Sequence, residues 1–398
     1  MRYEFVDETP SAKIKVFGVG GAGNNATNNM IAAGLRRVDF IVANPDKQAL
    51  DLSSALNKLQ MGANLTHGLG AGSDPERGEL AAEESVEAIR AAAEGADMIF
   101  ITAGMGGGTG TGGCPVIARE CKSVGALTVA VVTKPFDFEG EKRMQAALTG
   151  IERLKKEVDT LLIIPNQRLR ALGNKDTPFL ELMRMADEVL LYAVKGISDL
   201  ITIPGFINLD FADVKRIMEQ MGTAIMGTGK ASGENRALEV AQMAINSPLL
   251  EDISIDQAKG VLINITGSTK MTMDEVMEAS SFIKDEVHVD AEIIWGMVFD
   301  DNMDDEMRIT VIATGIGGIR ERKVINLRDL SPEETQEGWT VRSKDDLDKP
   351  TFQRRLAGEN DDMLPKETRL NSGKRGILHK LFQKEDLDYP TFLRKQAD

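Results

Sequence analysis

Gly104-Met105-Gly106-Gly107-Gly108-Thr109-Gly110-Thr111-Gly112 is the stretch of the sequence that decides the fold. It follows the apolar run Met98–Thr102, which predicts a strand, and leads into a predicted helix beginning near Cys114. Each glycine costs roughly 0.5–1 kcal/mol of ordering entropy, with no packing contact in return. A ligand explains such a loop better. We therefore interpret it as a nest of amides for phosphates, with the Thr109 and Thr111 hydroxyls as further donors.

The loop has no Gly-Lys-Ser/Thr and is not a P-loop. Polyphosphate charge must then be met by Mg²⁺, a helix dipole and other side chains. A second loop, Gly18-Val19-Gly20-Gly21-Ala22-Gly23-Asn24-Asn25, comes after the strand-like run Ile14–Phe17 and opens another helix. Alone, it also satisfies the G-x-G-x-x-G dinucleotide fingerprint, so a nicotinamide dehydrogenase is an alternative. That alternative leaves the loop at 104–112 unexplained and offers no clear hydride-transfer site.

Strands and helices alternate from Lys13 to about Asn166. The expected strands are Ile14–Phe17, Phe40–Val42, Met98–Thr102, Leu127–Val132 and Leu161–Ile164, and helices are expected at Glu76–Ala93 and Glu141–Val158. Short, almost continuously apolar strands indicate a parallel sheet covered on both faces, which binds ligands at the carboxyl ends of its strands. The fold class is α/β, with a Rossmann-like nucleotide-binding domain.

A long apolar helix is expected next, at Phe179–Leu200, and its pattern favours burial between two domains. Strands at Thr223–Met226, Gly260–Ile265, Glu292–Phe299 and Arg308–Ala313, with helices at Glu234–Asn246 and Met273–Lys284, predict a smaller α+β domain. The predicted divisions are an N-terminal extension (1–12), nucleotide domain (13–178), central helix (179–203), loop and following helix (204–222), α+β domain (223–318), linker (319–385) and terminal peptide (386–398).

After Gly318 the hydrophobic periodicity stops, and residues 319–385 are predicted to be a disordered linker. It holds a repeat: the segment at 344–355, KDDLDKPTFQRR, closely matches KEDLDYPTFLRK at 384–395. Two copies of so specific a string in an otherwise unpatterned tail suggest a binding motif rather than chance similarity.

The charge and composition of the chain disfavour several classes of function. The net charge is −15, and residues 1–318 hold 30 basic and 46 acidic side chains. So acidic a body is repelled by phosphate backbones and anionic lipid, which disfavours nucleic-acid binding and direct membrane insertion. No stretch approaches the ~20 apolar residues of a membrane span. The three histidines are scattered, Cys114 and Cys121 fit small buried residues, and the N-terminus has no apolar signal region. The chain is expected to be cytoplasmic.

The segment Gly106–Gly112 resembles the signature of the tubulin/FtsZ family. The resemblance spans Lys13–Gly318, through Asn44-Pro45-Asp46, Gly68-Leu69-Gly70-Ala71-Gly72, Thr133-Lys134-Pro135-Phe136 and Ile164-Pro165-Asn166. It implies a tubulin/FtsZ fold and a GTPase that binds GTP and GDP, with Mg²⁺ carried by the nucleotide rather than by a protein metal site. It also implies a self-polymerising protein that forms the bacterial division ring at mid-cell.

Carried over position by position, the resemblance implies a set of GTP-binding residues. These are Gly21, Ala22, Gly23, Asn24, Asn25, Gly107, Gly108, Thr109, Gly110, Glu139, Arg143, Asn166 and Asp187. Glu139 and Arg143 match positions that meet the ribose and phosphates, and Asp187 matches the guanine reader. Met183 stands where many relatives have a phenylalanine that stacks on the base, which implies somewhat weaker base binding.

Asn208, Asp210 and Asp213 follow the long helix. By themselves they fit a helix start, with Asn208 as N-cap and the acids facing the dipole. The resemblance implies that this loop meets the nucleotide of the next subunit, where the two aspartates orient and polarise the attacking water. Sites completed between head-to-tail subunits generate an open filament. A nucleotide-binding module without hydrolysis is the remaining alternative, and these three residues argue against it.

The terminal peptide also resembles a family element, the tail segment that docks on membrane-tethering division proteins such as FtsA. The residues expected to bind partners are Leu387, Tyr389, Pro390, Phe392, Leu393 and Arg394. Apolar side chains at these spacings can anchor in a groove once the segment orders.

Overall fold

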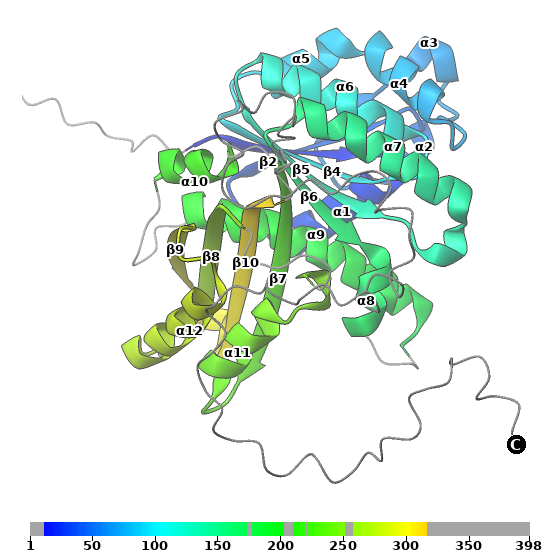
Figure 1. The fold of residues 1–398 in the computed structure, drawn as a ribbon. Coiled ribbons are helices and arrows are strands. Elements are labelled where there is room, and N and C mark those ends of the chain that lie inside the picture. The colour runs from blue at the N-terminus through cyan, green and yellow to red at the C-terminus, as the bar shows by residue number, and fades with distance from the viewer. Residues whose placement is uncertain (1–11, 173–176, 203–209, 220–221, 251–257, 317–398) are drawn as a thin grey trace, which may run out of the picture. The chain divides into compact units, whose positions relative to one another are not determined.

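A computed structural model describes residues 12–172, 177–202, 210–219, 222–250 and 258–316 (Figure 1). Asn208, the predicted linker and the predicted partner-binding peptide lie outside these residues. None of the helices in the described ranges has the length and hydropathy to cross a membrane.

In the described part of the chain, ten strands form one sheet in the order β3-β2-β1-β4-β5-β6-β7-β10-β8-β9. The strands are β1 (Ile14–Val19), β2 (Val38–Asn44), β3 (Asn57–Gln60), β4 (Met98–Gly104), β5 (Leu127–Lys134), β6 (Thr160–Pro165), β7 (Gly222–Ser232), β8 (Gly260–Gly267), β9 (Glu292–Phe299) and β10 (Glu306–Ile316). The strands from β3 to β7 in this order are parallel to one another, whereas β10 runs antiparallel to β7 and β8. The expected parallel α/β architecture is confirmed.

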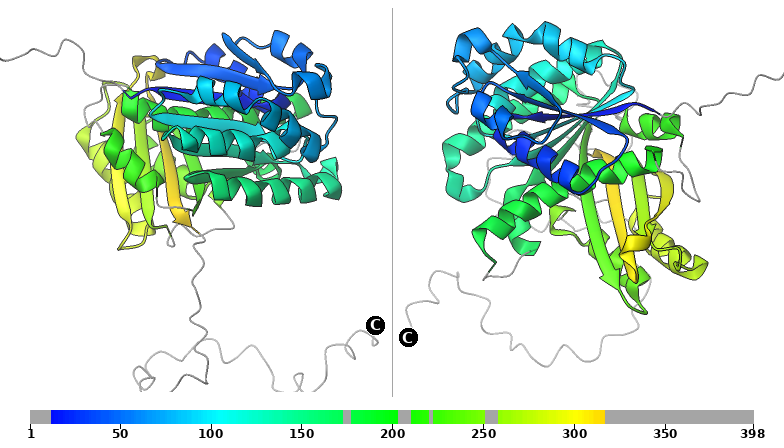
Figure 2. Two further views of the ribbon diagram at one scale, coloured as in Figure 1. Left: turned by 90° about the horizontal axis from the view of Figure 1, so that it is seen from above. Right: turned by 180° about the vertical axis from the view of Figure 1, so that it is seen from behind.

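Helices cover both faces of the parallel part (Figures 1 and 2). They are α1 (Gly20–Ala32), α2 (Lys47–Asp51), α3 (Ala63–Thr66), α4 (Pro75–Glu84), α5 (Val86–Ala93), α6 (Thr109–Ser123), α7 (Glu141–Glu157), α8 (Asn166–Leu172), α9 (Phe179–Thr202) and α10 (Phe211–Met218). Alternate strand residues face opposite layers because successive side chains leave a strand on opposite sides. Phe17 and Ile101 pack with α4–α7, whereas Val16 and Phe100 pack with α1 and α9.

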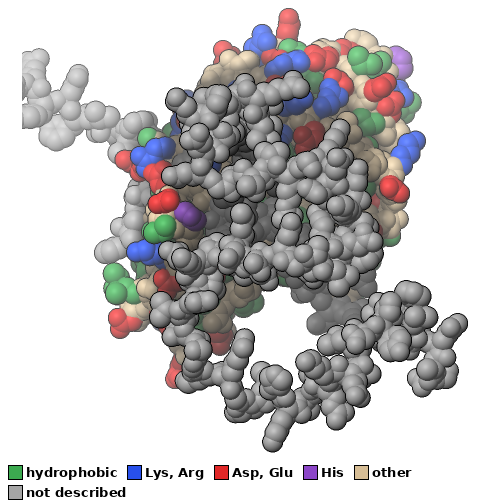
Figure 3. Space-filling view, in the orientation of Figure 1, with side chains coloured by type: hydrophobic (Ala, Val, Ile, Leu, Met, Phe, Trp, Pro, Cys, Tyr) green, Lys and Arg blue, Asp and Glu red, His purple; other side chains and the backbone are tan. Residues whose placement is uncertain are grey.

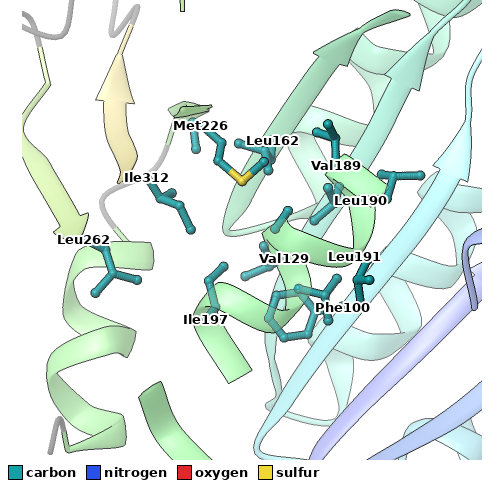
Figure 4. Packing of buried hydrophobic residues seen from close by; sticks show 14 of the residues in the cluster. Phe100, Val129, Leu162, Val189, Leu190, Leu191, Ile197, Met226, Leu262 and Ile312 are labelled. Carbon is teal, nitrogen blue, oxygen red and sulfur yellow. The ribbon is translucent and has the colours of Figure 1, made fainter. Parts of the chain in front are cut away.

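The long helix α9 lies between the two halves of the sheet (Figure 4). Its buried residues, among them Val189, Leu190 and Ile197, share one apolar cluster with Phe100 of β4 and Ile312 of β10. Its N-terminal turn differs from the expectation of a helix buried along its length, because Phe179 and Leu180 are exposed. That end of α9 projects beyond the core.

The C-terminal strands, with α11 (Arg236–Ile245) and α12 (Met273–Glu286), form the second half. Their own core joins α11 and α12 to β7, β8 and β10. The half is attached to the parallel sheet by pairing of β6 with β7, from Thr160 opposite Gly222 to Leu162 opposite Ala224. The two sheets predicted for the two halves are therefore continuous in the structure.

Two local predictions differ from the structure. The helix expected at Glu76–Ala93 is interrupted at Ser85, whose backbone (φ −110°, ψ 15°) is not helical and whose hydroxyl accepts the Gly62 N–H at 3.0 Å. The strand β3 was not predicted, because Asn57-Lys58-Leu59-Gln60 has little apolar content. Pairing with β2 creates it.

Candidate functional site

A cavity of about 520 Å³ opens at the carboxyl ends of the parallel strands. Its walls include Val19 at the end of β1, Asn44 at the end of β2, Gly104 at the end of β4 and Thr133 near the end of β5. The cavity lies where the chain order reverses, since β1 has β2 on one side and β4 on the other. Open α/β sheets bind ligands at this kind of crossover point.

Two helices begin at the cavity wall. α1 starts at Gly20 and α6 at Thr109, directly after the two glycine loops. Neither start has a side-chain cap or an acidic residue in its first turn. The first N–H groups of a helix have no partner within the helix and carry partial positive charge. Two uncapped starts at one cavity form a site for a ligand with several negative charges.

The glycines on the wall divide into two groups. A Cβ on Gly21 would meet no protein atom within 4 Å, and a Cβ on Gly107 would reach only the Arg143 Nη2 atom at 4.0 Å. A Cβ on Gly108 would meet Ala71 Cβ and two backbone atoms of Asp74, all at 2.9 Å. Gly108 is therefore required by packing, whereas the space beside Gly21 and Gly107 is open for a ligand.

Thr109 and Thr111 have different roles in the loop. Thr109 lines the cavity. Thr111 is buried, and its hydroxyl oxygen accepts the N–H of Gly106 at 2.8 Å, which fixes the turn where Gly106 has φ of 97°. The hydroxyl of Thr111 was expected to be a ligand donor. The structure instead uses it to hold the loop.

Glu139 and Arg143 stand together on the wall. The Arg143 Nη1 atom donates to the Glu139 Oε2 atom at 2.5 Å, and the Glu139 Oε1 atom accepts the Phe136 N–H at 2.8 Å. Glu139 is thus held at both oxygens, and it places the guanidinium of Arg143 beside Gly107. A fixed guanidinium beside open amides is suited to phosphate oxygens.

The far end of the cavity is formed by α8 and α9 and differs from the phosphate-facing wall in its chemistry. Asn166 and Met183 line the cavity, and the Asn166 Oδ1 atom is buried without a hydrogen-bond partner in the protein. A buried acceptor of this kind is costly unless a ligand supplies a donor. Asp187, one turn beyond Met183 on α9, accepts from the Asn29 Nδ2 atom at 2.9 Å. Burial raises the pKa of Asp187 to about 6, against that hydrogen bond.

Four of the sequence-predicted GTP-binding residues, Gly23, Asn24, Asn25 and Asp187, are not on the cavity wall. Gly23 is a packing residue, because a Cβ there would lie 2.4 Å from the Thr102 carbonyl oxygen. Asn24 is buried, and its amide nitrogen, in the orientation that its neighbours favour, donates to the carbonyls of Gly20 (2.9 Å) and Gly18 (3.2 Å). Asn25 is exposed. Together with Asp187 they surround the wall rather than form it, whereas Gly21, Ala22, Gly107, Gly108, Thr109, Gly110, Glu139, Arg143 and Asn166 line it.

Other wall residues were absent from the predicted site. They are contributed mainly by the segments after β2 and β3: Asn44, Asp46, Ala49, Leu69, Gly70, Ala71, Gly72 and Ser73. Gly70 and Gly72 have φ of 82° and 64°, a region that favours glycine, so the clustered glycines were the signal for a ligand-facing turn. Asp46 caps α2 through N–H groups of Gln48 and Ala49, at 2.9 and 3.3 Å.

The acidic pair lies at the other end of α9. Asp210 is the exposed N-cap residue of α10, without a side-chain cap bond, and Asp213 follows in the first turn, 3.8 Å from the Arg216 guanidinium. From Met183 on the cavity wall to Thr202, α9 spans roughly 28 Å at 1.5 Å per residue. The Thr202 carbonyl accepts from Arg37, which precedes β2, so this end of α9 lies at the amino ends of the strands.

The described residues show no group of three or more His, Cys, Asp or Glu that could hold a metal ion. Lys/Arg and Asp/Glu side chains lie interspersed on the uncovered part of one face (Figure 3).

Comparisons with known proteins agree with this geometry. Residues 13–174 match the model of the Tubulin/FtsZ family GTPase domain, and residues 222–317 match the model of the FtsZ family C-terminal domain. The chain is 51% identical over 327 residues to the cell division protein FtsZ of Rickettsia felis, covering 81% of this chain and 72% of that protein. It is 55% identical over 304 residues to the FtsZ of Magnetospirillum gryphiswaldense, which covers 76% of this chain but spans only 54% of the relative.

Solved structures extend the likeness. An empty FtsZ dimer from M. jannaschii matches with a TM-score of 0.74 and 45% identity, over 78% of this chain and 90% of that one. GDP-bound CetZ1 from Haloferax volcanii matches with a TM-score of 0.67 at 18% identity, over 77% and 96% of the two chains, and shows the shared fold alone. The fold and the cavity define a tubulin-like GTPase. Within that class, the chain belongs to the FtsZ family.

Proposed function

We propose that the cavity binds GTP and that each hydrolytic site is completed by the acidic pair of a second copy of the chain. The observation that carries the proposal is the placement of the two parts at opposite ends of α9. Met183 lines the cavity, whereas Asp210 and Asp213 follow the far end of the helix. A separation of roughly 28 Å along α9 prevents the aspartates from reaching the cavity of their own chain.

The cavity suits each part of the nucleotide. The uncapped starts of α1 and α6 supply amides for phosphates, with Gly21 and Gly107 leaving room for them. Arg143, oriented by Glu139, adds a positive charge on the same side. The unsatisfied Asn166 Oδ1 atom and the Asp187 carboxylate provide acceptors at the α9 end. Guanine has adjacent N–H and NH₂ donors for a carboxylate, and adenine does not.

Mg²⁺ would be held mainly by the bound nucleotide, because the acidic side chains of the cavity wall are engaged within the protein. The acidic side chains on the wall are Asp46 and Glu139, of which Glu139 is engaged by Arg143 and Phe136, and Asp46 caps α2. Mg²⁺ in such sites keeps several waters and uses phosphate oxygens. When bound it neutralises phosphate charge, and the protein would contribute at most a carboxylate to its outer shell.

At the completed site, Asp210 and Asp213 orient the attacking water toward the terminal phosphate. Both are at the start of α10 and are accessible to a second copy. Hydrolysis by such a site relies on positioning and electrostatics more than on covalent chemistry. Because pocket and acidic pair lie at opposite ends, each added copy repeats the contact, and the product is an open filament.

In cells, such a filament would form the division ring at mid-cell in the cytoplasm. The cell division names of the relatives support this role. The terminal peptide, through Leu387, Tyr389, Pro390, Phe392, Leu393 and Arg394, would recruit membrane-tethering partners such as FtsA. This part of the proposal rests on the sequence, since those residues lie outside the described ranges.

A complementation experiment tests the shared site. Asp213→Ala should bind GTP but lose hydrolysis, and Gly21→Val should lose GTP binding. In an equal mixture that assembles at random, about a quarter of the contacts pair an intact cavity with an intact acidic loop. Phosphate release should therefore reappear in the mixture while each variant alone stays inactive. Wild-type hydrolysis by Asp213→Ala alone, or an inactive mixture whose filaments contain both variants, would refute the shared site.

A further inference from the structure

A second cavity, of about 310 Å³, lies between α12 and the outermost strand of the sheet. Its apolar walls are Ile265 of β8, Val276 and Met277 of α12, and Trp295 and Met297 of β9. Met277 remains 56% exposed. No described strand lies beyond β9. Methionine side chains adapt to varied apolar partners, so this groove suits the apolar face of a short helix.

The helix that borders the groove is acidic. α12 carries the exposed residues Asp274, Glu278, Asp285 and Glu286, against one lysine, Lys284. An occupant that buries apolar side chains here would be favoured by basic residues on its other face.

The chain contains a segment of this chemistry in Lys374-Arg375-Gly376-Ile377-Leu378-His379-Lys380-Leu381-Phe382-Gln383-Lys384. It has four Lys/Arg residues and no Asp or Glu. At helical spacing, Ile377, Leu378, Leu381 and Phe382 share one face, because residues three and four apart are neighbours on a helix. The nucleotide site uses none of this segment, and the repeated tail motif shares only its last residue, Lys384.

The tether is long enough. The described residues end at Ile316, at the end of β10, and residues 317–373 separate it from the basic segment. A flexible chain of that length has an end-to-end distance of about 40 Å. The groove lies in the same half of the sheet, on β9, two strands away from β10. A tether that spans the gap without stretching gives effective concentrations on the order of millimolar.

We propose that residues 374–384 dock in the groove between α12 and β9 of their own chain. Ile377, Leu378, Leu381 and Phe382 contact the apolar wall, and the basic side chains face the acids of α12. The docked segment ends two residues before the terminal peptide at 386–398. Docking therefore holds that peptide against the body and competes with partner capture, a consequence that rests on the proposed function of the peptide.

Trp295 is a built-in reporter for docking. The full-length chain with Trp339→Phe keeps Trp295 as its sole tryptophan. We expect Leu381→Asp in this background to raise the acrylamide quenching constant of Trp295 at least twofold, because the groove becomes uncovered. Gln383→Asp is the matched control, since it adds the same charge on the opposite face at helical spacing. Equal quenching in the parent and both variants would overturn the proposal.

Disulfide trapping identifies the occupant. The native Cys114 and Cys121 are buried and burial raises their thiol pKa, so they are inert. In the full chain without nucleotide, Met277→Cys with Leu378→Cys should form a disulfide within one chain at least tenfold faster than Leu52→Cys with Leu378→Cys, because Leu378 lies on the face that contacts the groove. Leu52 is exposed at the C-terminal end of α2, which packs on the other half of the sheet. Equal rates, or disulfides chiefly between two chains, would overturn the proposal. Neither experiment uses GTP, so a failure here leaves the hydrolysis proposal untouched.

Discussion

Gly21→Val separates a glycine needed for the ligand from a glycine needed for packing. A Cβ at Gly21 meets no protein atom within 4 Å, and its backbone is helical, so the folded protein accommodates a side chain there. The added carbons occupy the space in front of the first amides of α1. Losing one hydrogen bond to a charged phosphate costs about 1.5–3 kcal/mol, which corresponds to roughly 10–150-fold in affinity.

Gly23→Ala is the control, two residues further along the same helix. Its Cβ would lie 2.4 Å from the Thr102 carbonyl oxygen and 2.9 Å from the Gly18 carbonyl carbon, and Gly23 does not line the cavity. We expect it to lower the free energy of unfolding by about 1–3 kcal/mol, as overpacking does. Gly21→Val should change it by less than about 0.5 kcal/mol.

The assay pairs equilibrium dialysis against labelled GDP with urea unfolding in the absence of nucleotide. GDP avoids the complication of hydrolysis and assembly. If Gly21→Val binds GDP within twofold of the parent, the cavity is not the phosphate site. If it unfolds at clearly lower urea while Gly23→Ala does not, the assignment of the two glycines is reversed.

Three further predictions concern the base-reading end, the C-terminal half and the tail. GDP affinity should fall as pH drops below about 6, by up to tenfold per pH unit, because guanine binds the ionised form of Asp187, whose pKa is raised by burial. In parallel titrations, Asp187→Asn should remove the pH dependence of affinity that comes from this carboxyl group. An unchanged dependence would contradict the base-reading role. The same raised pKa means that protonation of Asp187 favours the nucleotide-free fold, so its contribution to stability is greatest below about pH 4 and is lost as pH rises through about 6. Glu275→Ala breaks the buried ion pair with Arg236 and should lower the free energy of unfolding by ~3 kcal/mol. This is the lower end for a buried ion pair, because Arg236 still has Asp305 as a partner. The control Glu278→Ala, on the exposed face of α12, should leave the urea midpoint unchanged. In the tail, peptide 384–395 should bind a membrane-tethering partner far more tightly than peptide 344–355. Lys349 and Gln353 replace Tyr389 and Leu393 in the second peptide, and each lost apolar contact is worth ~1.5–3 kcal/mol of binding free energy. Equal affinities in titrations would contradict this ranking.

The two glycine loops and the parallel sheet were predictable because they depend on local sequence. Loops at 18–25 and 104–112 follow apolar runs directly, and strands of a parallel sheet place their carboxyl ends at one edge. The contribution of Asp46 and Gly70 to the wall depended on the order of β3, β2 and β1, which no local pattern specifies.

Individual glycines were harder to interpret than the loops that contain them. Gly21 and Gly23 are two residues apart in one motif, yet one faces open space and the other the Thr102 carbonyl. Only the packing of α1 on β4 distinguishes them. The same holds for Thr111, whose hydroxyl turns inward to Gly106 because α6 begins two residues earlier.

The packing of α9 on both halves of the sheet makes the two halves a single cooperative unit. One apolar cluster holds Phe100 of β4, Leu190 of α9 and Ile312 of β10, so neither half can open without exposing the surface that it shares with the other. A ligand at 100 times its dissociation constant adds about 2.7 kcal/mol to the free energy of unfolding. In a cooperative unit, amide protons of β8 and β9 gain that protection from hydrogen exchange although they lie far from the cavity. Binding of a ligand in the cavity therefore slows the opening of β8 and β9 in the other half of the sheet.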